Sequence, residues 1–397
     1  MSNVLNVAAR QAANRIAVEP ARNAVQTTTE TSHSLPAGAI NVVMLGPALD
    51  VMGGVASVER LICTGVPDHI RVQHIPTMRD GGGLTKGWVF AASVLRFNRQ
   101  LRRTPDVVHL HFASGASSKR KMILAALAQR RGARVVLHAH GGYYRNYWER
   151  IGAREKALAS QVFRNVSALI VLGESWRDFF ASIGVPRSRI VVLPNPVSLP
   201  SKVPVRRGNA KVRAVYLGLM TRTKGTFDLV DAVGRLPRSI RDRLHLVIAG
   251  NGEIAAIRRM VEELGLRSCI EVRGWQTAQQ RDELLAQSEV FVLPSYFEGL
   301  PMAMLEAMAW ALVPVCTPVG SVGDVIASEE NGLLVGPGEI DALAVALSRL
   351  VEDSTTRARL AERARLSVEP LSLDRYVAKL TDVYAAVAAN RPVTEIL

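Results

Sequence analysis

With 397 residues, 48% of them apolar and 21% charged, the chain has the composition of a globular protein and the length of two ordinary domains. Its three cysteines lie far apart, which argues against a disulfide framework or a cysteine metal site and favours a reducing cytoplasm, and no apolar run reaches the roughly 20 residues that span a bilayer. The net charge of +14 predicts an anionic partner, but zinc-finger spacing and aromatic RNA-binding motifs are missing, so nucleic acid is not expected.

Residues 1–38 combine arginines with a TTTETSHS tract and show no hydrophobic periodicity. This composition predicts a disordered tail, with a transit peptide or a short interfacial amphipathic helix as the alternatives. The segment lacks the compact apolar stretch of a secretory signal, so secretion is not expected.

From residue 39 onward, short apolar runs alternate with helical stretches. In the first half, strands are expected at residues 40–46, 106–112, 133–140, 168–173 and 189–195. A glycine-containing loop, DVMGG, and a helical VASVERLIC follow the first of these strands. Because the runs are apolar on both faces, they predict a parallel sheet covered by helices on both sides.

The proline-rich segment after residue 197 predicts a linker at 198–211. The alternation then restarts, with strands expected at residues 214–220, 244–250, 269–274, 290–295 and 313–317. The predicted domains are therefore 39–197 and 212–371, with a C-terminal helix and tail at 372–397. The fold class is α/β, with two doubly wound, Rossmann-like domains facing a cleft.

Polar residues cluster where the predicted strands of the second half end. Arg222 and Lys224 follow one strand, and SYFEGLPMAMLE follows another. Pro301 suits the first turn of a helix, which places Glu298 in the loop before that helix and Glu306 within it. The free N–H groups of the helix start form an anion site that Lys224 can share, so a diphosphate is predicted there. Carboxylates beside this anion site can accept hydrogen bonds from sugar hydroxyls. A ligand with both a diphosphate and sugar hydroxyls is a nucleotide sugar.

These segments also carry a resemblance to a known family. YLGLMTRTKGTFDLV, VIAGNGE, SYFEGLPMAMLEAMAWALVPVCTPVGSVGDVI and NGLLV resemble retaining glycosyltransferases of family 4, which have the GT-B fold. Glutamates with seven residues between them, here Glu298 and Glu306, are that family's hallmark. In the first half, GPALDVMGGVASVE resembles its glycine-rich loop and VVLHAHGG its histidine-bearing strand end. The resemblance covers roughly residues 40–345 in order.

The resemblance implies a role for each matching residue. Lys224 binds the donor diphosphate, Glu298 faces the transferred sugar and Glu306 faces the nucleotide ribose. His140 lies near the reacting sugar, and the other donor-binding positions are backbone of Gly53, Gly54, Gly299, Leu300 and Pro301. Cofactors and metal ions are not expected. The family's usual arginine after the strand-end glycine is Leu219 here, and Arg222 is the candidate to replace it. The usual glutamate further on is Asp324.

Other interpretations of the same residues stay open. GNGEIA at 250–255, with Glu271 further on, fits a dinucleotide fingerprint and a remote NAD-dependent enzyme, although it follows the second strand of its domain and not the first. Of the four histidines at 109, 111, 138 and 140, one or two are expected to be hydrogen-bonded core residues. A zinc site is the less favoured interpretation. An inactive nucleotide-sugar-binding protein and another GT-B enzyme, such as an epimerase or phosphorylase, are the further alternatives.

The excess of basic over acidic residues lies entirely in the first half of the chain. Residues 1–200 contain 25 Lys and Arg against 11 Asp and Glu, whereas residues 201–397 contain 24 of each. This asymmetry predicts contact with an anionic membrane surface and a saccharide acceptor carried on a lipid diphosphate. A solvated basic face with no membrane role is the alternative. The expected location is the cytoplasm or the inner face of the cell membrane, and likeness to exopolysaccharide mannosyltransferases favours GDP-mannose as the donor.

Overall fold

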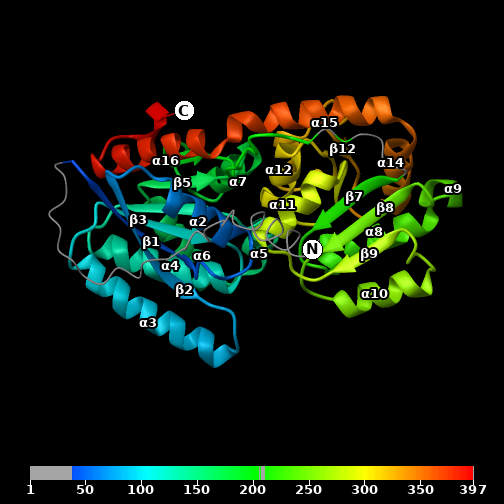
Figure 1. Cartoon of the computed structure of the whole chain (residues 1–397). Coiled ribbons are helices and arrows are strands. Elements are labelled where there is room, and N and C mark those ends of the chain that lie inside the picture. Colours follow the sequence, from blue (N-terminus) through cyan, green and yellow to red (C-terminus); the bar gives the residue numbers. More distant parts are fainter. Residues whose placement is uncertain (1–37, 205, 207–210, 397) are drawn as a thin grey trace, which may run out of the picture. The chain divides into compact units, whose positions relative to one another are not determined.

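In the computed structural model, residues 38–204, 206 and 211–396 are described. They form two six-stranded parallel sheets with helices between successive strands (Figure 1). Of the predicted tail at 1–38, residues 1–37 lie outside the described residues, as do residue 205 and residues 207–210 of the predicted linker and residue 397.

The first sheet has the strand order β2-β1-β3-β4-β5-β6, and all of its pairs are parallel. Its strands are β1 Ile40–Pro47, β2 Ile70–Met78, β3 Val107–Phe112, β4 Val135–Ala139, β5 Ala168–Val171 and β6 Ile190–Val192. The intervening helices are α2 Gly54–Gly65, α3 Gly83–Leu101, α4 Ala116–Arg130, α5 Tyr144–Arg150, α6 Ala153–Arg164, α7 Glu174–Ser182 and the 3-10 turn η1 Arg187–Arg189.

The second sheet has the order β12-β11-β10-β7-β8-β9, again parallel throughout. Its strands are β7 Val212–Leu217, β8 Leu244–Ala249, β9 Ile270–Arg273, β10 Val290–Leu293, β11 Val313–Cys316 and β12 Leu333–Leu334. Its helices are η2 Arg222–Lys224, α8 Thr226–Arg235, α9 Arg238–Arg241, α10 Ile254–Glu263, α11 Ala278–Gln287, α12 Met302–Ala309, α13 Val322–Val325, α14 Ile340–Glu352 and α15 Ser354–Val368.

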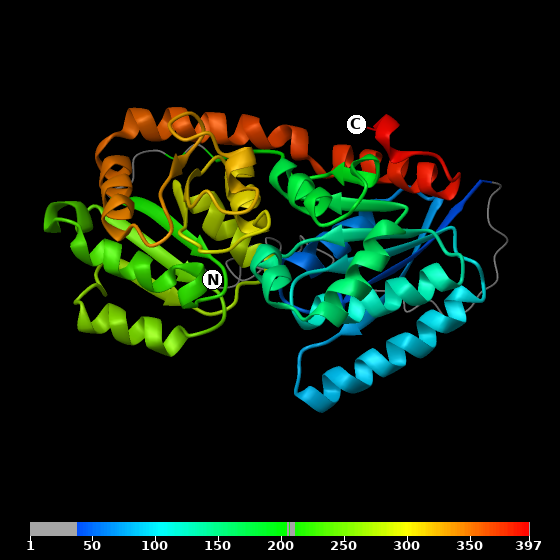
Figure 2. The same ribbon diagram turned by 180° about the vertical axis from the view of Figure 1, so that it is seen from behind.

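Alternation along β1 shows why the first sheet is covered on both faces. Val43 and Leu45 pack in the same apolar cluster as α4 and α6, whereas Val42 and Met44 pack with α2 and the C-terminal helix α16 Leu373–Ala388. Figure 2 shows these helix layers from behind. The doubly wound fold class predicted from sequence is confirmed.

The C-terminal helix returns to the first sheet. After η3 (Glu369–Leu371), the Val197 N–H donates to the Leu371 carbonyl, and α16 then buries Tyr376, Leu380 and Tyr384 against α2 and β1. The chain ends with η4 (Val393–Ile396). The last helix of the sequence therefore completes the core of the first sheet.

The strands β2 and β12 were not predicted, nor was the long helix α3 that lies between β2 and β3. β2 alternates exposed and half-buried positions and includes Arg71, Gln73 and His74, so it lacks a continuous apolar run. It is the edge strand of its sheet, where one-sided burial is sufficient.

Every helix in the described ranges falls short, in length or in apolar character, of what a bilayer crossing requires.

Candidate active site

The loop that follows β10 carries the first of the two predicted glutamates. It runs from Pro294 to Pro301, and α12 begins directly after Pro301, as the sequence predicted. Proline suits this place because its φ is already helical and its missing N–H would have no helical partner. Glu298 lies in this loop, four positions before the first residue of α12, and 8% of its surface is exposed.

A cation from the neighbouring strand end meets Glu298. The Lys224 ammonium, at the end of η2, donates to Glu298 Oε1 at 2.6 Å, and the buried Ser295 hydroxyl donates to the same oxygen at 2.8 Å. The Lys224 side chain is 29% exposed. The structure thus joins two side chains whose predicted targets were different parts of one ligand. The ammonium keeps donors that can reach an anion from the open side.

Gly225 places Lys224. Its φ of 65° lies in the left-handed region, and a Cβ atom there would come within 1.9 Å of the Pro294 carbonyl oxygen. Only glycine combines this backbone conformation with so close an approach. The turn therefore holds Lys224 directly against the Glu298 loop.

Arg222 does not join this pair. Its guanidinium lies over the Phe227 ring, 4.7 Å from the ring centroid, and Leu219 is half-exposed. Among the contacts of the described residues, none links Arg222 to Lys224 or Glu298. That Arg222 replaces the family's arginine stays a prediction, which requires the side chain to leave Phe227 when a ligand binds.

Glu306 is held by a residue that the sequence did not single out. Arg281, on α11, donates to Glu306 Oε1 at 2.8 Å and also pairs with Asp282. Burial raises the pKa of Glu306 from its ordinary value of 4.5 to about 7, although Arg281 opposes the shift. The carboxyl therefore changes charge near neutral pH.

This raised pKa predicts a pH-dependent stability difference between the wild type and Glu306→Gln. Because the folded-state pKa exceeds the unfolded one, the neutral carboxyl favours folding at low pH, and that contribution is lost as the pH rises through about 7. Glutamine stays neutral, so the variant should gain stability relative to the wild type between about pH 5 and pH 8. Urea unfolding at each pH measures the difference, and a constant difference would contradict the assignment.

Glycines allow two loops to approach closely. A Cβ on Gly142, after β4, would lie 2.1 Å from the Glu298 carbonyl carbon, and one on Gly299 would lie 2.5 Å from the His140 carbonyl oxygen. A Cβ on Gly54, in the first glycine-rich loop, would be 3.7 Å from Met302 Cγ. The predicted backbone positions Gly53, Gly54 and Gly299–Pro301 therefore gather around the start of α12.

Two further contacts join the ends of the two sheets. The Asn195 amide, which is buried, donates to the Leu300 carbonyl at 2.7 Å. A Cβ on Gly173, before α7, would overlap the Asp324 carboxylate at 1.9 Å, so Asp324 lies against the start of α7. Asn195 was predicted only as part of the strand before the linker. Its role in holding the Leu300 loop has no signal in the local sequence.

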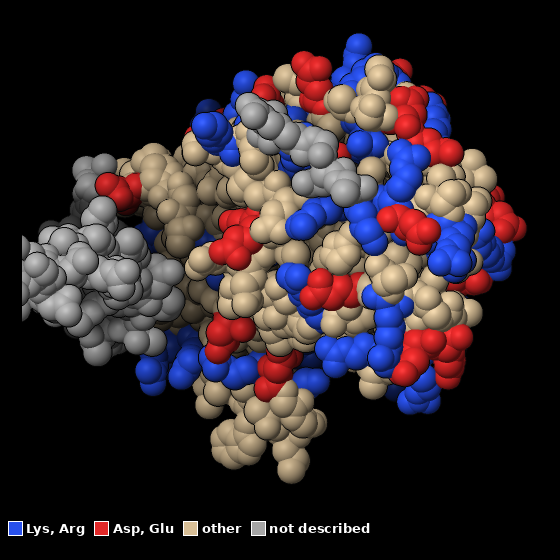
Figure 3. Space-filling view, turned by 45° about the vertical axis from the view of Figure 1, so that its right-hand side comes forward, with Lys and Arg blue, Asp and Glu red and all other residues tan. Residues whose placement is uncertain are grey.

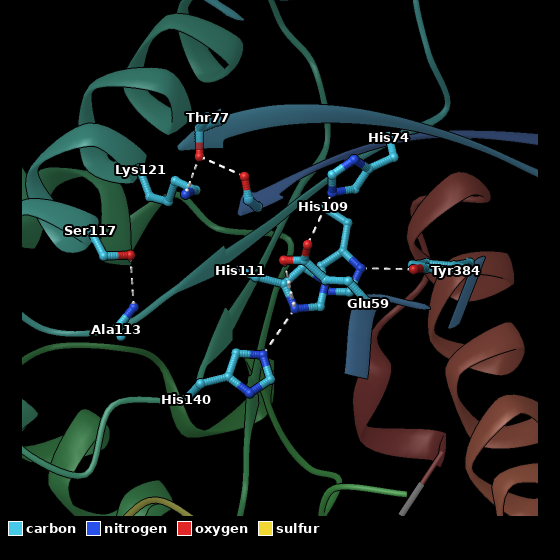
Figure 4. Close-up of polar contacts among 11 residues, drawn as sticks. Glu59, His74, Thr77, His109, His111, Ala113, Ser117, Lys121, His140 and Tyr384 are labelled. Carbon is cyan, nitrogen blue, oxygen red and sulfur yellow. Dashed lines mark hydrogen bonds and ion pairs between the residues drawn. The ribbon is translucent and has the colours of Figure 1, made fainter. Parts of the chain in front are cut away.

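His140 belongs to a group of imidazoles on one face of β3 and β4 (Figure 4). His140 Nε2 lies 2.9 Å from His111 Nδ1, and His109 Nδ1 lies 2.7 Å from the Tyr384 hydroxyl of α16. Burial lowers the pKa of both His109 and His140 to about 3. His140 is therefore neutral at physiological pH and can hydrogen-bond a ligand without carrying charge.

A buried carboxylate closes this polar group from α2. Glu59 Oε2 contacts His74 Nε2 at 3.0 Å, and its Oε1 lies 3.8 Å from His111 Nδ1. The ligand nitrogens of His109, His111 and His138 lie within 4.8 Å of one another. The hydrogen bonds of His109 and His111 fit the predicted core role.

Lys121, counted from sequence with the basic surface, is buried and donates to the Thr77 hydroxyl at 2.5 Å (Figure 4). Burial lowers its pKa to about 7. Lys119 is exposed but pairs with Glu155 at 3.1 Å. The basic surface of the first half is therefore smaller than the sequence suggested.

Comparison with known proteins agrees with this arrangement. Residues 24–196 match the family described as Glycosyl transferase 4-like domain, and residues 203–367 match Glycosyl transferases group 1. A glycosyltransferase of Bacillus subtilis assigned to teichuronic acid biosynthesis, TuaC, is 28% identical over 285 residues, 68% of each chain. GDP-mannose:cellobiosyl-diphosphopolyprenol alpha-mannosyltransferase of Xanthomonas oryzae is 26% identical over 286 residues, covering 70% of this chain and 71% of the relative.

Among solved structures, Anabaena HepE in complex with UDP and glucose superposes with a TM-score of 0.69 at 15% identity. The match covers 87% of this chain and all of HepE. The two doubly wound sheets are thus those of the GT-B class of glycosyltransferases. The two family models together span most of the chain, and the protein belongs to the glycosyltransferase family that they describe.

The family membership weighs against the dinucleotide alternative. The structure adds that both Glu271 carboxylate oxygens accept from Arg273, at 2.7 and 3.0 Å. The carboxylate is therefore already engaged at the place where a ribose contact was considered. Gly250 instead approaches the Gly218 carbonyl, where a Cβ would lie at 1.8 Å.

Proposed function

We propose that the protein transfers a hexose from a nucleotide-diphosphate sugar, with retention of configuration, to a saccharide acceptor carried on a lipid diphosphate in surface polysaccharide synthesis. The observation that carries this proposal is the Lys224–Glu298 pair just before α12, with the Glu306–Arg281 pair about one turn into that helix. Cation, helix start and two carboxylates suit a diphosphate flanked by hydroxyl groups.

Each residue has a role in this proposal. Lys224 and the free backbone N–H groups at the start of α12 bind the diphosphate. Glu298 accepts hydrogen bonds from the sugar hydroxyls. Glu306 accepts from the ribose, oriented by Arg281. His140, neutral through burial, hydrogen-bonds the sugar, and the close glycine loops exclude water.

In the reaction, the bond between the anomeric carbon and the diphosphate oxygen breaks, and a bond from that carbon to an acceptor hydroxyl oxygen forms. The acceptor proton passes to the departing diphosphate oxygen on the same face of the sugar, which gives retention. Lys224 and the helix start stabilise the charge that develops on the leaving group, so we propose that no metal ion or other cofactor is required. A double displacement needs a nucleophile on the opposite sugar face, and Glu298 is instead bound to Lys224.

The donor we propose is GDP-mannose. A mannosyltransferase relative named for GDP-mannose supports this choice, whereas HepE was solved with UDP and glucose. The acceptor class rests on the same relative, which is named for a diphosphopolyprenol acceptor. Such an acceptor would place the protein in the cytoplasm, at the inner face of the cell membrane.

The test is a transfer reaction with GDP-mannose and a polyprenyl-diphosphate-linked disaccharide, with the product followed by NMR. An α-mannosyl product would establish hexosyl transfer with retention. Free mannose 1-phosphate formed from glycoside and phosphate would indicate a phosphorylase instead. A β-linked product would refute retention while leaving the transferase class intact.

A further inference from the structure

We propose that the outward face of α3 docks the protein on an anionic lipid bilayer. This inference deepens the proposed function, on which it rests for the membrane-bound acceptor. Its structural evidence is the surface of one helix. Lipid binding can be measured without donor or acceptor, so the test does not depend on glycosyl transfer.

Helix α3 presents three large apolar side chains to solvent between residues 84 and 95. Leu84 is 87% exposed, Trp88 77% and Leu95 74%. Their spacing of four and seven residues places them on one face of the helix. The opposite face is buried through Ser93, Phe97 and Leu101.

An aligned row of exposed leucine and tryptophan is unusual on a monomer, because single apolar residues are normally scattered and larger patches mark an interaction site. Nothing in this row packs on another element: all three side chains are more exposed than Val345 or Leu366, the exposed apolar residues of α14 and α15. The face therefore lacks a partner within the described chain.

Basic residues continue the same row. Arg99 and Arg102 follow Leu95 at intervals of four and three, and both are exposed. The sequence contains no acidic residue between Asp80 and Asp106. Along this face an apolar row from Leu84 to Leu95 is thus followed by a cationic stretch at Arg99 and Arg102.

Figure 1 shows α3 as the lowest element of the view. Figure 3 is turned only about the vertical axis, so the tan projection at its lower edge belongs to this helix, with blue Lys and Arg side chains beside it. The high exposures of Leu84, Trp88 and Leu95 show that these apolar side chains can reach beyond the surface.

This combination fits a bilayer better than a protein or a nucleic acid. Tryptophan and leucine partition into the interfacial region, while arginine pairs with anionic headgroups, each basic residue contributing about 1 kcal/mol near the surface. A nucleic acid would bind the arginines through its phosphates and would leave the leucines without a partner. A bilayer uses both halves of the row at once.

The experiment is sedimentation of the full chain with vesicles of phosphatidylcholine, with and without phosphatidylglycerol. The wild type should bind only the anionic vesicles, less well at high salt. The triple variant Leu84→Ser, Trp88→Ser, Leu95→Ser and the double variant Arg99→Gln, Arg102→Gln should each lower the partition coefficient about tenfold or more. Val345→Ser with Leu366→Ser is the matched control and should bind as the wild type does.

Two readouts separate the outcomes. Trp88 emission should shift to shorter wavelength on anionic vesicles, and thermal unfolding should be unchanged in all variants because every altered side chain is exposed. Undiminished binding of the triple variant would overturn the proposal. Failure of the wild type to bind anionic vesicles would also overturn it, and reversible self-association would then identify a second copy of the chain as the partner of this face. Vesicle binding without glycosyl transfer would leave this proposal standing and refute the proposed function.

Discussion

Replacement of Lys224 by methionine is expected to lower kcat/KM for glycosyl transfer by about 10²–10³-fold, or about 3–4 kcal/mol of transition-state stabilisation. Methionine keeps most of the apolar stem and removes the ammonium, which lies 2.6 Å from Glu298 Oε1. Without that charge, the departing diphosphate loses its nearest cation in a partly buried site. Steady-state transfer kinetics with increasing donor concentration measure the loss.

The variant has two controls. Lys224→Arg retains the charge and should recover part of the lost activity, although a planar guanidinium fits the place of an ammonium poorly. Lys379→Met alters an exposed lysine of α16 and should be neutral. Thermal unfolding checks the fold, because Glu298 keeps only the Ser295 hydroxyl as its partner when Lys224 is gone. Near-wild-type kcat/KM in a folded Lys224→Met protein would remove Lys224 from the site.

Gly225→Ala is expected to destabilise the protein by about 2–4 kcal/mol. A left-handed backbone costs an alanine about 1 kcal/mol relative to glycine. The new Cβ would also lie 1.9 Å from the Pro294 carbonyl oxygen, and relief of such an overlap typically costs a further 1–3 kcal/mol, roughly. The movement would displace Lys224, so transfer activity should fall with stability.

Gly234→Ala, near the end of the adjacent helix α8, is the matched control. Its Cβ would meet Leu264 at 3.6 Å, an ordinary contact, and alanine favours the helix. This variant should be as stable as the wild type or up to about 1 kcal/mol more stable. Urea unfolding of both variants decides the matter, and equal stabilities would show that the Gly225 turn tolerates a side chain.

The sequence predicted the architecture well where apolar runs are continuous. β3 and β10 are buried along their whole length, and both were found from pattern alone. β2 and α3 were missed for opposite reasons. β2 mixes polar residues into an edge strand, and α3 directs its tryptophan and two of its leucines outward, so its hydrophobic period does not report the buried face.

Long-range packing explains the rest of the fold that the sequence did not predict. A C-terminal helix and tail were expected at 372–397, and α16 spans Leu373–Ala388. The place of this helix in the core of the first sheet depends on contacts such as Tyr384 with His109, separated by 275 positions. Local propensity carries no information about such partners.

Within the candidate site, motif residues were predicted and their partners were not. Glu298 and Lys224 come together at strand ends, as the rule for parallel sheets leads one to expect. Arg281 and Asn195 hold Glu306 and Leu300 from other elements, and neither lies in a recognisable motif. The roles of all the proposed site residues in binding and transfer stay predictions.

The proposed function depends most directly on a nucleotide-sugar site at Lys224, Glu298 and Glu306. The measurement that tests it is thermal unfolding of the purified chain against GDP-, UDP-, ADP- and dTDP-sugars. A ligand at a hundred times its dissociation constant adds about 2.7 kcal/mol of stability, which is readily seen. If the site binds a nucleotide sugar, Tm should rise clearly with one nucleotide class, GDP-mannose foremost, and this rise should be lost in Lys224→Met. An equal rise in both proteins, or no rise with any sugar nucleotide, would contradict it.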